Sequence, residues 1–496
     1  MKNIEYFFNP RSIAVIGASR EETKPGYIIL KNIVENKRRE IFRGEIYPIN
    51  PYAKKILGLH SYPSILNISG DIDLAIIIVP AKTVPKIMEE CGKKGVKTAI
   101  IISAGFSEIG NVELEDKVLK IAKKYGVRII GPNCLGIFSP YNGIDTFFLP
   151  IFKDLKSGGS RLATPRPDKG FVSFISQSGA FGTAALDYMW GEKIGIRYFI
   201  SYGNRIDVDE ADLLEYLGED EYTRAIMIYV EGIENGRKFM RIARRVSIKK
   251  PVIALKSGRT RAGARAAVSH TAAMAGKDEI YEAAFKQCGV IRAYSMRDFF
   301  IYAKALVYQP PAKGNRVAII TDGGGAGVMT TDACEINGLN VVKIGGESRK
   351  KLKDLMDKKI LPEFAVIDNP IDLTGSASTE MYVETFKIML GDRNIDSIII
   401  LALHHVPGIK YLDEFVKSIV EANEKYNVDR KPVISVDIGG SPAANYVREE
   451  FDKHFIPSYS SPEDGVMAIK ALYLFGKYLR KRRVYRKYVR RWKPLV

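Results

Sequence analysis

The segment AAVSHTAAMAG, residues 266–276, places His270 between a serine and a threonine within a run of alanines. The chain has only five histidines, and the segment matches neither a buried strand nor an ordinary core helix. A neutral imidazole is nucleophilic near pH 7, so group transfer is one chemistry open to His270. A lone histidine among small residues is also common without any chemical role, and the segment alone leaves both interpretations open.

Three places share one pattern, in which an apolar strand leads through a Gly-rich turn into a helix. They are SIAVIGASR from Ser12, GFVSFISQSGAFG from Gly170 and RVAIITDGGGAG from Arg316. Backbone N–H groups at the start of a helix attract phosphate. One such turn could simply need glycine for its geometry, but three in one chain favour phosphate chemistry.

The same three openings indicate the domain organisation, because they recur at intervals of roughly one domain length. Between them lie nearly continuous Val/Ile runs such as DLAIIIVPA, AIMIYVEG and SIIILALHH, which are typical of strands buried on both faces of a parallel sheet. The Pro/Gly/Lys mixtures at 149–168 and 309–315 predict exposed connectors. We therefore predict an α/β chain with domains at residues 1–150, 165–308 and 314–480, followed by a basic tail at 481–496.

The composition narrows the function classes. The chain has 75 basic and 57 acidic residues, a net charge of +18, and its basic run Lys477–Arg491 accompanies no RNA-recognition motif. We interpret that run as a solvated helix or a subunit contact, not as a nucleic-acid site. The four cysteines are far apart, without metal-ligand or disulfide-scaffold spacing. No stretch of ~18 apolar residues and no signal peptide is present, which predicts a cytoplasmic protein.

The first Gly-rich turn, GASREETKPG, lacks the GxGxxG fingerprint of a dinucleotide fold. The following strand ends in asparagine, proline and lysines where that fold has an acidic residue for the ribose. A phosphorylated adenosine carrier such as CoA fits these residues better than NAD. The predicted CoA-binding residues, which lie at successive strand ends, are Gly17, Ala18, Ser19, Arg20, Gly26, Asn50, Lys54, Val79, Pro80, Ala104, Gly105 and Asn133.

Several long motifs are similar to those of the NDP-forming acyl-CoA synthetase family, a relative of succinyl-CoA synthetase. They include INP…ILG, DLAIIIVPA, ISQSGAFG, SYGNRIDVDEADLLEYL, LKSGRTRAGARAAVSHTAA, TDGGGAGVMTTDACE and NPIDLTG, and cover nearly the whole chain. The likeness is greatest to alpha subunits of the ADP-forming acetate–CoA ligase type. It implies a Rossmann-like CoA-binding domain followed by two flavodoxin-like domains.

The resemblance implies that acyl-CoA, ADP and phosphate are converted into carboxylic acid, CoA and ATP. It further implies that an acyl phosphate passes its phosphoryl group to His270 and that Glu231 orients the imidazole. Phosphate is held at two helix starts, by Ser178, Gly179, Ala180, Gly323, Gly324, Gly325 and Gly327. Many family members have SHTG where this chain has SHTAA, and asparagine at the position of Asp322, which puts phosphate contact by that side chain in doubt.

The chain has no GxxxxGK[ST] loop for a nucleotide. The resemblance implies an ATP-grasp module on a separate beta subunit, an α2β2 assembly, and Mg²⁺ that arrives with ADP or ATP. No metal site is predicted in this chain itself. The preferred acid, and the choice between ADP and GDP, stay open.

Two other functions are compatible with CoA-binding motifs: a CoA-binding regulatory protein without turnover, and a CoA-binding module of the acyltransferase type. Retention of His270 and Glu231 argues against the first, and the lack of a further domain against the second. The pair His404–His405 ends a predicted strand, where neighbouring side chains point to opposite faces, so a shared metal is not expected. No Ser/His/Asp arrangement is recognisable in the sequence.

Overall fold

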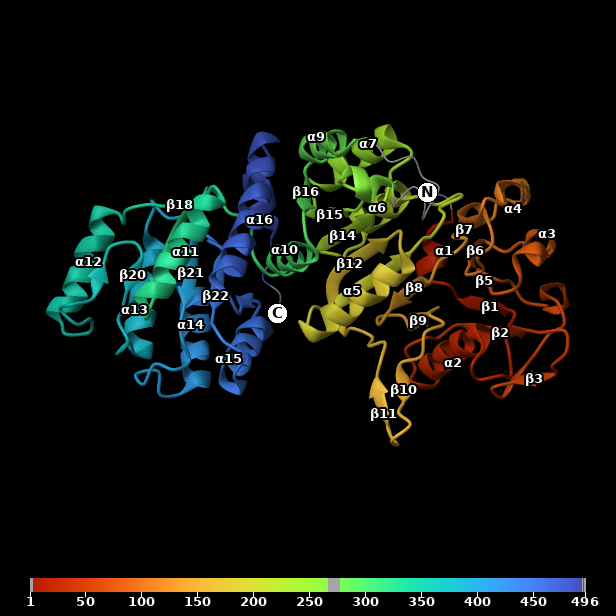
Figure 1. Ribbon diagram of the computed structural model, residues 1–496, viewed down its shortest axis with the longest axis horizontal. Coiled ribbons are helices and arrows are strands. Elements are labelled where there is room, and N and C mark those ends of the chain that lie inside the picture. Colours follow the sequence, from red (N-terminus) through yellow and green to blue (C-terminus); the bar gives the residue numbers. More distant parts are fainter. Residues whose placement is uncertain (1–2, 266–276, 493, 495–496) are drawn as a thin grey trace. The chain divides into compact units, whose positions relative to one another are not determined.

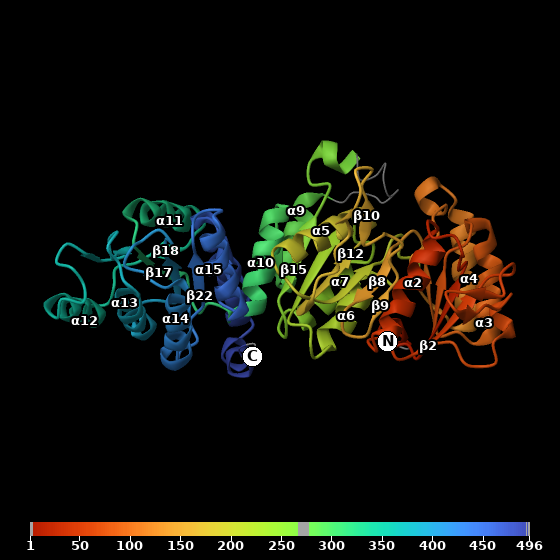
Figure 2. The ribbon, with the colours of Figure 1, turned by 90° about the horizontal axis from the view of Figure 1, so that it is seen from below.

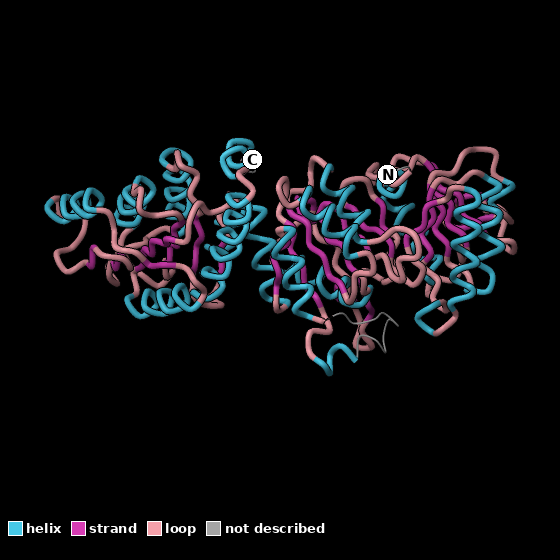
Figure 3. Tube along the Cα trace, turned by 90° about the horizontal axis from the view of Figure 1, so that it is seen from above, coloured by secondary structure: helices cyan, strands magenta, loops and turns pink. Residues whose placement is uncertain are grey.

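The computed structural model describes residues 3–265, 277–492 and 494. The chain divides into two compact units, Met1–Tyr294 and Ser295–Val496. The first unit contains two large sheets and the second contains one, and each sheet lies between layers of helices (Figure 1, Figure 2 and Figure 3). Within the described ranges, no helix has both the length and the apolar character required to cross a membrane.

The first sheet has the strand order β2–β1–β5–β6–β7, with parallel pairing throughout. Its strands are β1 (Ser12–Ile16), β2 (Glu45–Ile49), β5 (Leu74–Ile77), β6 (Thr98–Ile101) and β7 (Arg128–Ile130). Its helices are α1 (Glu5–Phe8), α2 (Pro25–Arg38), α3 (Val84–Lys94) and α4 (Val112–Tyr125). The short elements are β3 (Lys55–Ile56), β4 (Leu59–His60), η1 (Ile65–Asn67), η2 (Ala81–Thr83) and η3 (Ser107–Ile109).

Strand β1 is buried on both faces, as its apolar run predicts. Ile13 and Val15 belong to the apolar cluster that contains the buried face of α2. Ala14 and Ile16 belong to the cluster that contains the buried faces of α3 and α4. Because successive side chains of a strand point to opposite faces, this alternation places α2 on one side of the sheet and α3 and α4 on the other.

The second sheet has the order β16–β15–β14–β12–β13–β8–β9. Its strands are β8 (Gly136–Ser139), β9 (Ile144–Asp145), β12 (Lys169–Ser176), β13 (Ile196–Ser201), β14 (Ala225–Val230), β15 (Val252–Lys256) and β16 (Val290–Ala293). Its helices are α5 (Gly179–Gly191), α6 (Glu210–Glu219), α7 (Gly236–Val246) and α9 (Asp278–Cys288). Strands β8 and β9 pair antiparallel at the edge of this sheet, although they precede the predicted connector.

The two sheets of the first unit share one apolar core. Residues of β1 and α2 lie in the same cluster as residues of β13, β14, α6 and α7. At its centre Phe8 packs edge-on against Tyr198, at 4.8 Å between ring centroids, and stacks on Tyr216 at 4.2 Å. The first two domains are therefore joined by packed aromatic side chains and not only by a connector.

The predicted connector at 149–168 contains a hairpin of β10 (Phe152–Asp154) and β11 (Ser160–Leu162). The hairpin is exposed along its length and projects from the sheets (Figure 1). Thr164, Pro165 and Pro167 are buried, so the segment after the hairpin is only partly exposed.

The third sheet has the order β19–β20–β17–β21–β22–β23, with β18 also paired to β17, and only β19–β20 is antiparallel. Its strands are β17 (Arg316–Thr321), β18 (Asn340–Val341), β19 (Val366–Ile367), β20 (Ile371–Asp372), β21 (Ser397–Leu401), β22 (Val433–Val436) and β23 (Ser458–Tyr459). Its helices are α10 (Met296–Tyr308), α11 (Gly324–Ile336), α12 (Gly346–Asp357), α13 (Thr379–Gly391), α14 (Leu412–Tyr426), α15 (Pro442–Lys453), α16 (Pro462–Lys481) and α17 (Tyr485–Arg491). Three successive parallel-sheet domains are thus present, as predicted.

The prediction of an exposed connector at 309–315 is wrong. Gln309 and Ala312 are buried, and the side chain of Gln309 bonds to the backbone of Val433 and Phe455. The Ala312 N–H donates to the Leu472 carbonyl in α16. Proline and glycine mark an irregular segment, but these residues also fit a buried segment whose backbone groups find partners.

The basic segment near the end of the chain packs against the fold through its apolar side chains and its backbone. Helix α17 packs on α16, with Phe475 and Tyr488 in edge contact at 5.1 Å. The Arg430 guanidinium donates to the Val489 and Trp492 carbonyls at 2.6 and 2.5 Å. These carbonyls lie at the end of α17, where a cation is favoured.

Gly476 in α16 tests the packing around the buried segment, because a Cβ there would overlap the Ala312 carbonyl. We expect Gly476→Ala to lower the free energy of unfolding by about 1–3 kcal/mol, which a lower melting temperature would reveal. Gly391→Ala is the matched control, since Gly391 is an exposed helical glycine with open space around its Cβ position. Equal melting temperatures for the two variants would contradict the tight packing of α16.

Candidate active site between the first two sheets

The loop that follows β13 is fastened to the end of β7. The Asn204 N–H donates to the Pro132 carbonyl at 2.9 Å, and the Val208 N–H to the Ile129 carbonyl at 3.1 Å. Gly203 has a φ of 55°, and a Cβ there would overlap the Pro132 carbonyl. Only glycine fits this conformation and this close approach. The carboxyl edges of the two sheets are thereby held side by side.

A cavity of about 670 Å³ lies between these two edges. From the first domain and its end it is lined by Ile102, Ala104, Ser107, Glu108, Val112, Glu115, Asn133, Cys134, Leu135, Phe148 and Leu149. From the second it is lined by Gln177, Ser178, Gly179, Ala180, Thr183, Gly203, Asn204, Arg205, Glu231 and Glu234. The cavity thus brings predicted CoA-binding residues, Ala104 and Asn133, together with the predicted phosphate-binding residues of α5 and with Glu231.

Helix α5 begins at the cavity wall. Its N-cap Ser178 accepts a hydrogen bond from the Phe181 N–H through Oγ at 3.2 Å, and its carbonyl accepts from the Gly182 N–H. The N–H groups of Gly179 and Ala180 belong to the first turn, where no carbonyl of the helix can reach them. They are the groups that the helix offers to an anion.

Gly182 explains how α5 lies so close to the sheet, because a Cβ at this position would meet the Phe199 ring at 2.7 Å or less. The missing side chain lets the first turn of the helix settle directly at the end of β12.

Glu231 follows β14 and is held in place through its backbone. Its N–H donates to the Gln177 side-chain oxygen at 2.8 Å, and the Gly232 N–H donates to the same oxygen at 3.3 Å. The Glu231 residue is 8% exposed and lines the cavity. Gln177 was missed by the sequence analysis, although it precedes Ser178 in the ISQSG motif.

Asn204 has a positioning role. Its amide nitrogen lies 2.7 Å from Glu108 Oε2, 2.8 Å from Glu115 Oε2 and 3.1 Å from Ser107 Oγ. Burial raises the pKa of Glu108, but hydrogen bonds from the Gly105 N–H and the Asn204 amide outweigh it, and the pKa is lowered overall. Asn204 therefore fixes two carboxylates of the first domain against the second.

Arg205 forms the cationic part of the wall. It donates to the Gly232 carbonyl at 2.5 Å and pairs with Glu234 at 2.9 Å. Glu210 lies 3.8 Å from the same guanidinium, and burial raises its pKa to about 7 although Arg205 acts in the opposite direction. Lys256 ends the neighbouring strand β15, and burial lowers its pKa. The sequence motifs contain Arg205 and Lys256 but gave no signal that marked them.

The remaining predicted CoA-binding residues lie at the same edge of the first sheet, outside the cavity lining. A Cβ at Gly17 would overlap the Ile78 carbonyl, and one at Gly26 would overlap the Gly17 carbonyl. The Asn50 amide donates to the Ala18 carbonyl at 2.8 Å and so closes the turn. These contacts let the start of α2 pack on the end of β1.

Four other predicted residues at this edge are found as follows. The Val79 N–H donates to the Ser103 hydroxyl, which in turn donates to the Val79 carbonyl. The Gly105 N–H donates to the Glu108 carboxylate at 2.5 Å. Arg20 and Lys54 are exposed. The other members of the predicted set, Ser19 and Pro80, belong to the same loops.

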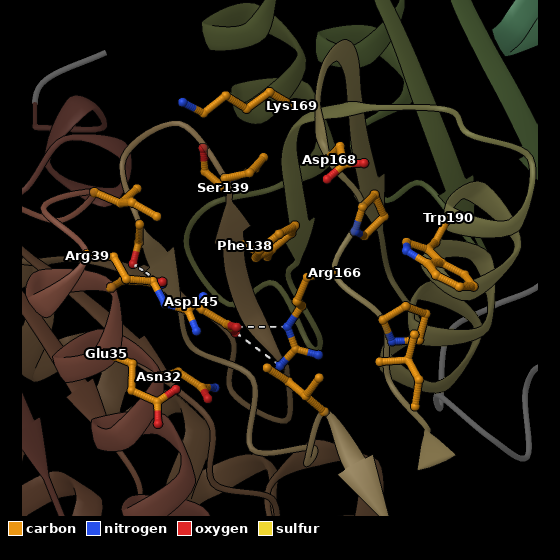
Figure 4. Close-up of a pocket in the computed structure, with 18 residues that line it drawn as sticks. Asn32, Glu35, Arg39, Phe138, Ser139, Asp145, Arg166, Asp168, Lys169 and Trp190 are labelled. Carbon is orange, nitrogen blue, oxygen red and sulfur yellow. Dashed lines mark hydrogen bonds and ion pairs between the residues drawn. The ribbon is translucent and has the colours of Figure 1, made fainter. Parts of the chain in front are cut away.

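A second cavity, also of about 670 Å³, lies near the opposite end of β12 (Figure 4). Its Arg166 is tied to Asp145 at 2.8 Å and packs over the Phe147 ring at 4.7 Å. Further bonds from Arg166 reach the Thr164 and Leu149 carbonyls. None of the predicted site residues lines this cavity, so the first cavity is the candidate active site.

The glycine turn of the third domain differs from the turn at α5. The Gly323 N–H is bonded to Thr321 Oγ1 at 3.1 Å, and Asp372 lies so close to Gly324 that a Cβ there would be 2.9 Å from its carboxylate. Asp322 is buried, and its carboxylate accepts from the Leu403 N–H at 2.9 Å. The Asp322 carboxylate is thus hydrogen-bonded to the loop that follows β21. Gly325 and Gly327 lie in the first turn of α11.

The expectation that His404 and His405 point to opposite faces is wrong. Strand β21 ends at Leu401, and the two imidazole rings lie side by side with centroids 3.8 Å apart. Among the residues that the structure describes, no three His, Cys, Asp or Glu side chains are grouped to hold a metal ion. His270 lies outside the described residues.

The domains match three family models in succession. A CoA binding domain covers residues 11–140, a succinyl-CoA ligase like flavodoxin domain covers 169–306, and a ligase-CoA domain covers 317–481. Together with the cavity between the first two domains, these matches define a CoA-dependent ligase with succinyl-CoA ligase-like domains.

Comparison with known relatives shows to which family within this class the chain belongs. The chain is 42% identical, over 95% of its length, to the alpha subunit of acetate–CoA ligase (ADP-forming) II of Pyrococcus furiosus, of which it covers 97%. It therefore belongs to the NDP-forming acyl-CoA synthetase family, among the alpha subunits of ADP-forming acetyl-CoA synthetases, as the motifs predict.

Two further comparisons concern a longer relative and a solved structure. The chain is 42% identical to the acetate–CoA ligase (ADP-forming) of Methanocaldococcus jannaschii, but spans only 63% of that protein's length. The solved structure is the dinucleotide-forming acetyl-CoA synthetase 1 of Ca. Korarchaeum cryptofilum in complex with phosphate and ADP. It matches with a TM-score of 0.86 and 38% identity, covering 97% of this chain and 99% of that one.

The buried carboxylate of Asp322 should make the free energy of unfolding depend on pH. Burial raises its pKa to about 6 although the Leu403 hydrogen bond acts in the opposite direction, so the folded chain keeps a proton that the unfolded chain has lost. Its contribution to stability therefore falls as the pH rises from about 4 to about 6. We expect Asp322→Asn to gain stability relative to the unmodified chain over this window, by on the order of 1–3 kcal/mol.

Melting curves between these two pH values measure the effect. Asp332→Asn, which removes an exposed carboxylate from helix α11 after the turn that contains Asp322, is the control and should follow the unmodified chain. If the melting temperature of Asp322→Asn changed with pH in the same way as that of the unmodified chain, the pKa of Asp322 would not be raised by folding.

Proposed function

We propose that this chain is the catalytic alpha subunit of an ADP-forming acetate–CoA ligase. A phosphate oxygen attacks the thioester carbonyl, the CoA thiolate leaves, and an acyl phosphate forms. A ring nitrogen of His270 takes the phosphoryl group and the carboxylate leaves. The phosphohistidine then passes the group to ADP, which gives ATP. Each step exchanges one bond to the carbonyl carbon or to phosphorus for another.

The cavity between the first two sheets carries the proposal. It sets Ala104 and Asn133, at strand ends of the CoA-binding domain, opposite the start of α5. A thioester held by the first domain and a phosphate held at Ser178 therefore meet in one place, which lowers the entropic cost of the reaction. The first-turn N–H groups of α5 face the charge that develops on the phosphoryl oxygens.

The described parts of the second domain support a role for His270. The chain leaves the carboxyl edge of the sheet at Lys256 and returns to it at Asp278, which pairs with Arg292 near the end of β16. The same edge carries Ser178 and Glu231. Glu231 acts as the positioning residue, since a carboxylate that accepts one ring N–H orients the other nitrogen for attack.

A second polypeptide completes the enzyme. The relative in Pyrococcus furiosus is named a subunit alpha, and the Korarchaeum enzyme was solved with phosphate and ADP. We assign the ADP site and its Mg²⁺ to an ATP-grasp beta subunit in an α2β2 assembly. The resemblance assigns a second phosphate-binding position to the glycines 323–327 at the start of α11, where the carboxylate of Asp372 lies beside Gly324. Acetate is the first acid to test.

Replacement of the carrier histidine tests the chemistry. With labelled phosphate and acetyl-CoA, His270→Asn should lose acid-labile labelling by at least about 100-fold while CoA affinity changes by less than about twofold. His60→Asn, at an exposed histidine, is the control and should label normally. Labelling that persists in His270→Asn would assign the phosphate to another residue.

The need for a partner is tested by assembly. The purified chain should form no ATP from acetyl-CoA, ADP and phosphate until an ATP-grasp beta subunit is added, because the ADP site lies on that subunit. A coupled assay for ATP, with and without the beta subunit, measures this. Full activity of the chain on its own would exclude the proposed division between subunits.

A further inference from the structure

Three side chains at the carboxyl edge of the third sheet form a hydrogen-bonded chain. His404 follows β21, Asp437 follows β22, and Ser441 is the N-cap of α15. The His404 Nδ1 lies 2.8 Å from Asp437 Oδ1, and its Nε2 lies 2.9 Å from Ser441 Oγ. The His404 and Asp437 side chains are 6% and 1% exposed. Asp, His and Ser in this order form a relay that activates a serine.

The hydrogen-bond directions follow from the chemistry of the three groups. A carboxylate only accepts, so Nδ1 carries the proton that is donated to Asp437, and in the neutral imidazole Nε2 is left as an acceptor. In this tautomer the Ser441 hydroxyl donates to Nε2. Its oxygen in turn accepts from the Ala444 N–H at 3.2 Å. The serine proton is thus directed at a neutral imidazole nitrogen, as general-base activation requires.

The backbone presents Ser441 on a turn between a strand and a helix. Gly439 has a φ of 135°, in the left-handed region, and a Cβ there would lie 3.4 Å from His404 Cε1. Gly440 is exposed, and the space at its Cβ position is open. Glycine at both positions lets the turn pass the imidazole and leaves an approach to Ser441. Serine nucleophiles of hydrolases occupy such turns.

One feature of that arrangement is missing. Pro442 follows the serine and has no N–H, so the donor that usually follows a serine nucleophile is absent. The Ala443 N–H, in the first turn of α15, is the remaining donor for an oxyanion. Loss of one such donor slows acyl transfer by about 10²–10³-fold. The geometry therefore fits a slow, single-site acylation better than rapid turnover.

We propose that Ser441 is an activated nucleophile that takes the acyl group from donors with a good leaving group. Ser441 Oγ forms a bond to the carbonyl carbon, and its proton passes to His404 Nε2. The bond to the leaving group breaks, and the leaving group takes that proton. Water then hydrolyses the acyl-serine, with Nε2 as the base. The site involves neither His270 nor the cavity of the first unit, so it stands independently of the proposed function.

The test uses the full chain and p-nitrophenyl acetate, with peptide mass spectrometry to locate the acetyl groups. Acetylation of Ser441 with an equivalent burst of nitrophenol is the expected result. Ser441→Ala should abolish the burst, and His404→Gln should reduce labelling of Ser441 by about 10²–10⁴-fold. Asp437→Asn, which keeps the size of the side chain, should also reduce labelling of Ser441. This variant replaces His404→Gln in the test if His404→Gln does not fold.

Ser378→Ala is the matched control, because Ser378 caps α13 through the Met381 N–H in the same way. It should show a small drop in melting temperature like that of Ser441→Ala, but an unchanged burst. Acetylation confined to lysines, or equal labelling of Ser441 in His404→Gln, would overturn the proposal. Incubation with acetyl phosphate, which can donate an acetyl or a phosphoryl group, shows which group Ser441 accepts. Acetylation of Ser441 supports the proposal, and phosphorylation of Ser441 overturns it.

Discussion

The site depends on the contact between the backbone of residues 203–208 and the end of β7. Gly203 lies against the Pro132 carbonyl, and the following residues bond to the backbone of Ile129 and Pro132. Arg128 adds an ion pair to Asp207 at 2.8 Å. This contact lies where the start of α5 and the carboxyl edge of the first sheet border one cavity. The geometry of the site is therefore fixed mainly by main-chain groups, and only secondarily by the side chains that line it.

The three Gly-rich turns that look alike in the sequence offer three different environments to an anion. After β1 the chain forms a loop before α2 begins at Pro25, without a side-chain cap. After β12 the helix begins at once, and Ser178 caps it while leaving two N–H groups for a ligand. After β17 the carboxylate of Asp372 lies beside Gly324. A glycine pattern predicts a sharp turn, whereas the charge at that turn depends on residues distant in sequence.

The sequence could predict features that depend on local patterns, but not features that depend on contacts between distant residues. Buried Val/Ile runs placed the central strands, because burial on both faces is a property of each strand. The pairing of β8 and β9 with the second sheet, and the burial of Gln309, depend on partners that no local pattern reveals. In the site, Gln177 and Asn204 also lie in sequence motifs, but their hydrogen bonds to Glu231 and to Glu108 and Glu115 appear only in the structure. The relay joins His404 to Asp437 and Ser441, which lie more than thirty positions further along the chain.

The common apolar core of the first two domains has a consequence for how substrates come and go. Phe8 is clamped between Tyr198 and Tyr216, and apolar side chains of both sheets surround it. A hinge opening would expose these rings to water, at about 1.5–3 kcal/mol for each large side chain uncovered. Separation of the two sheets would therefore be costly, and the shared core favours a fixed distance between the two walls of the cavity.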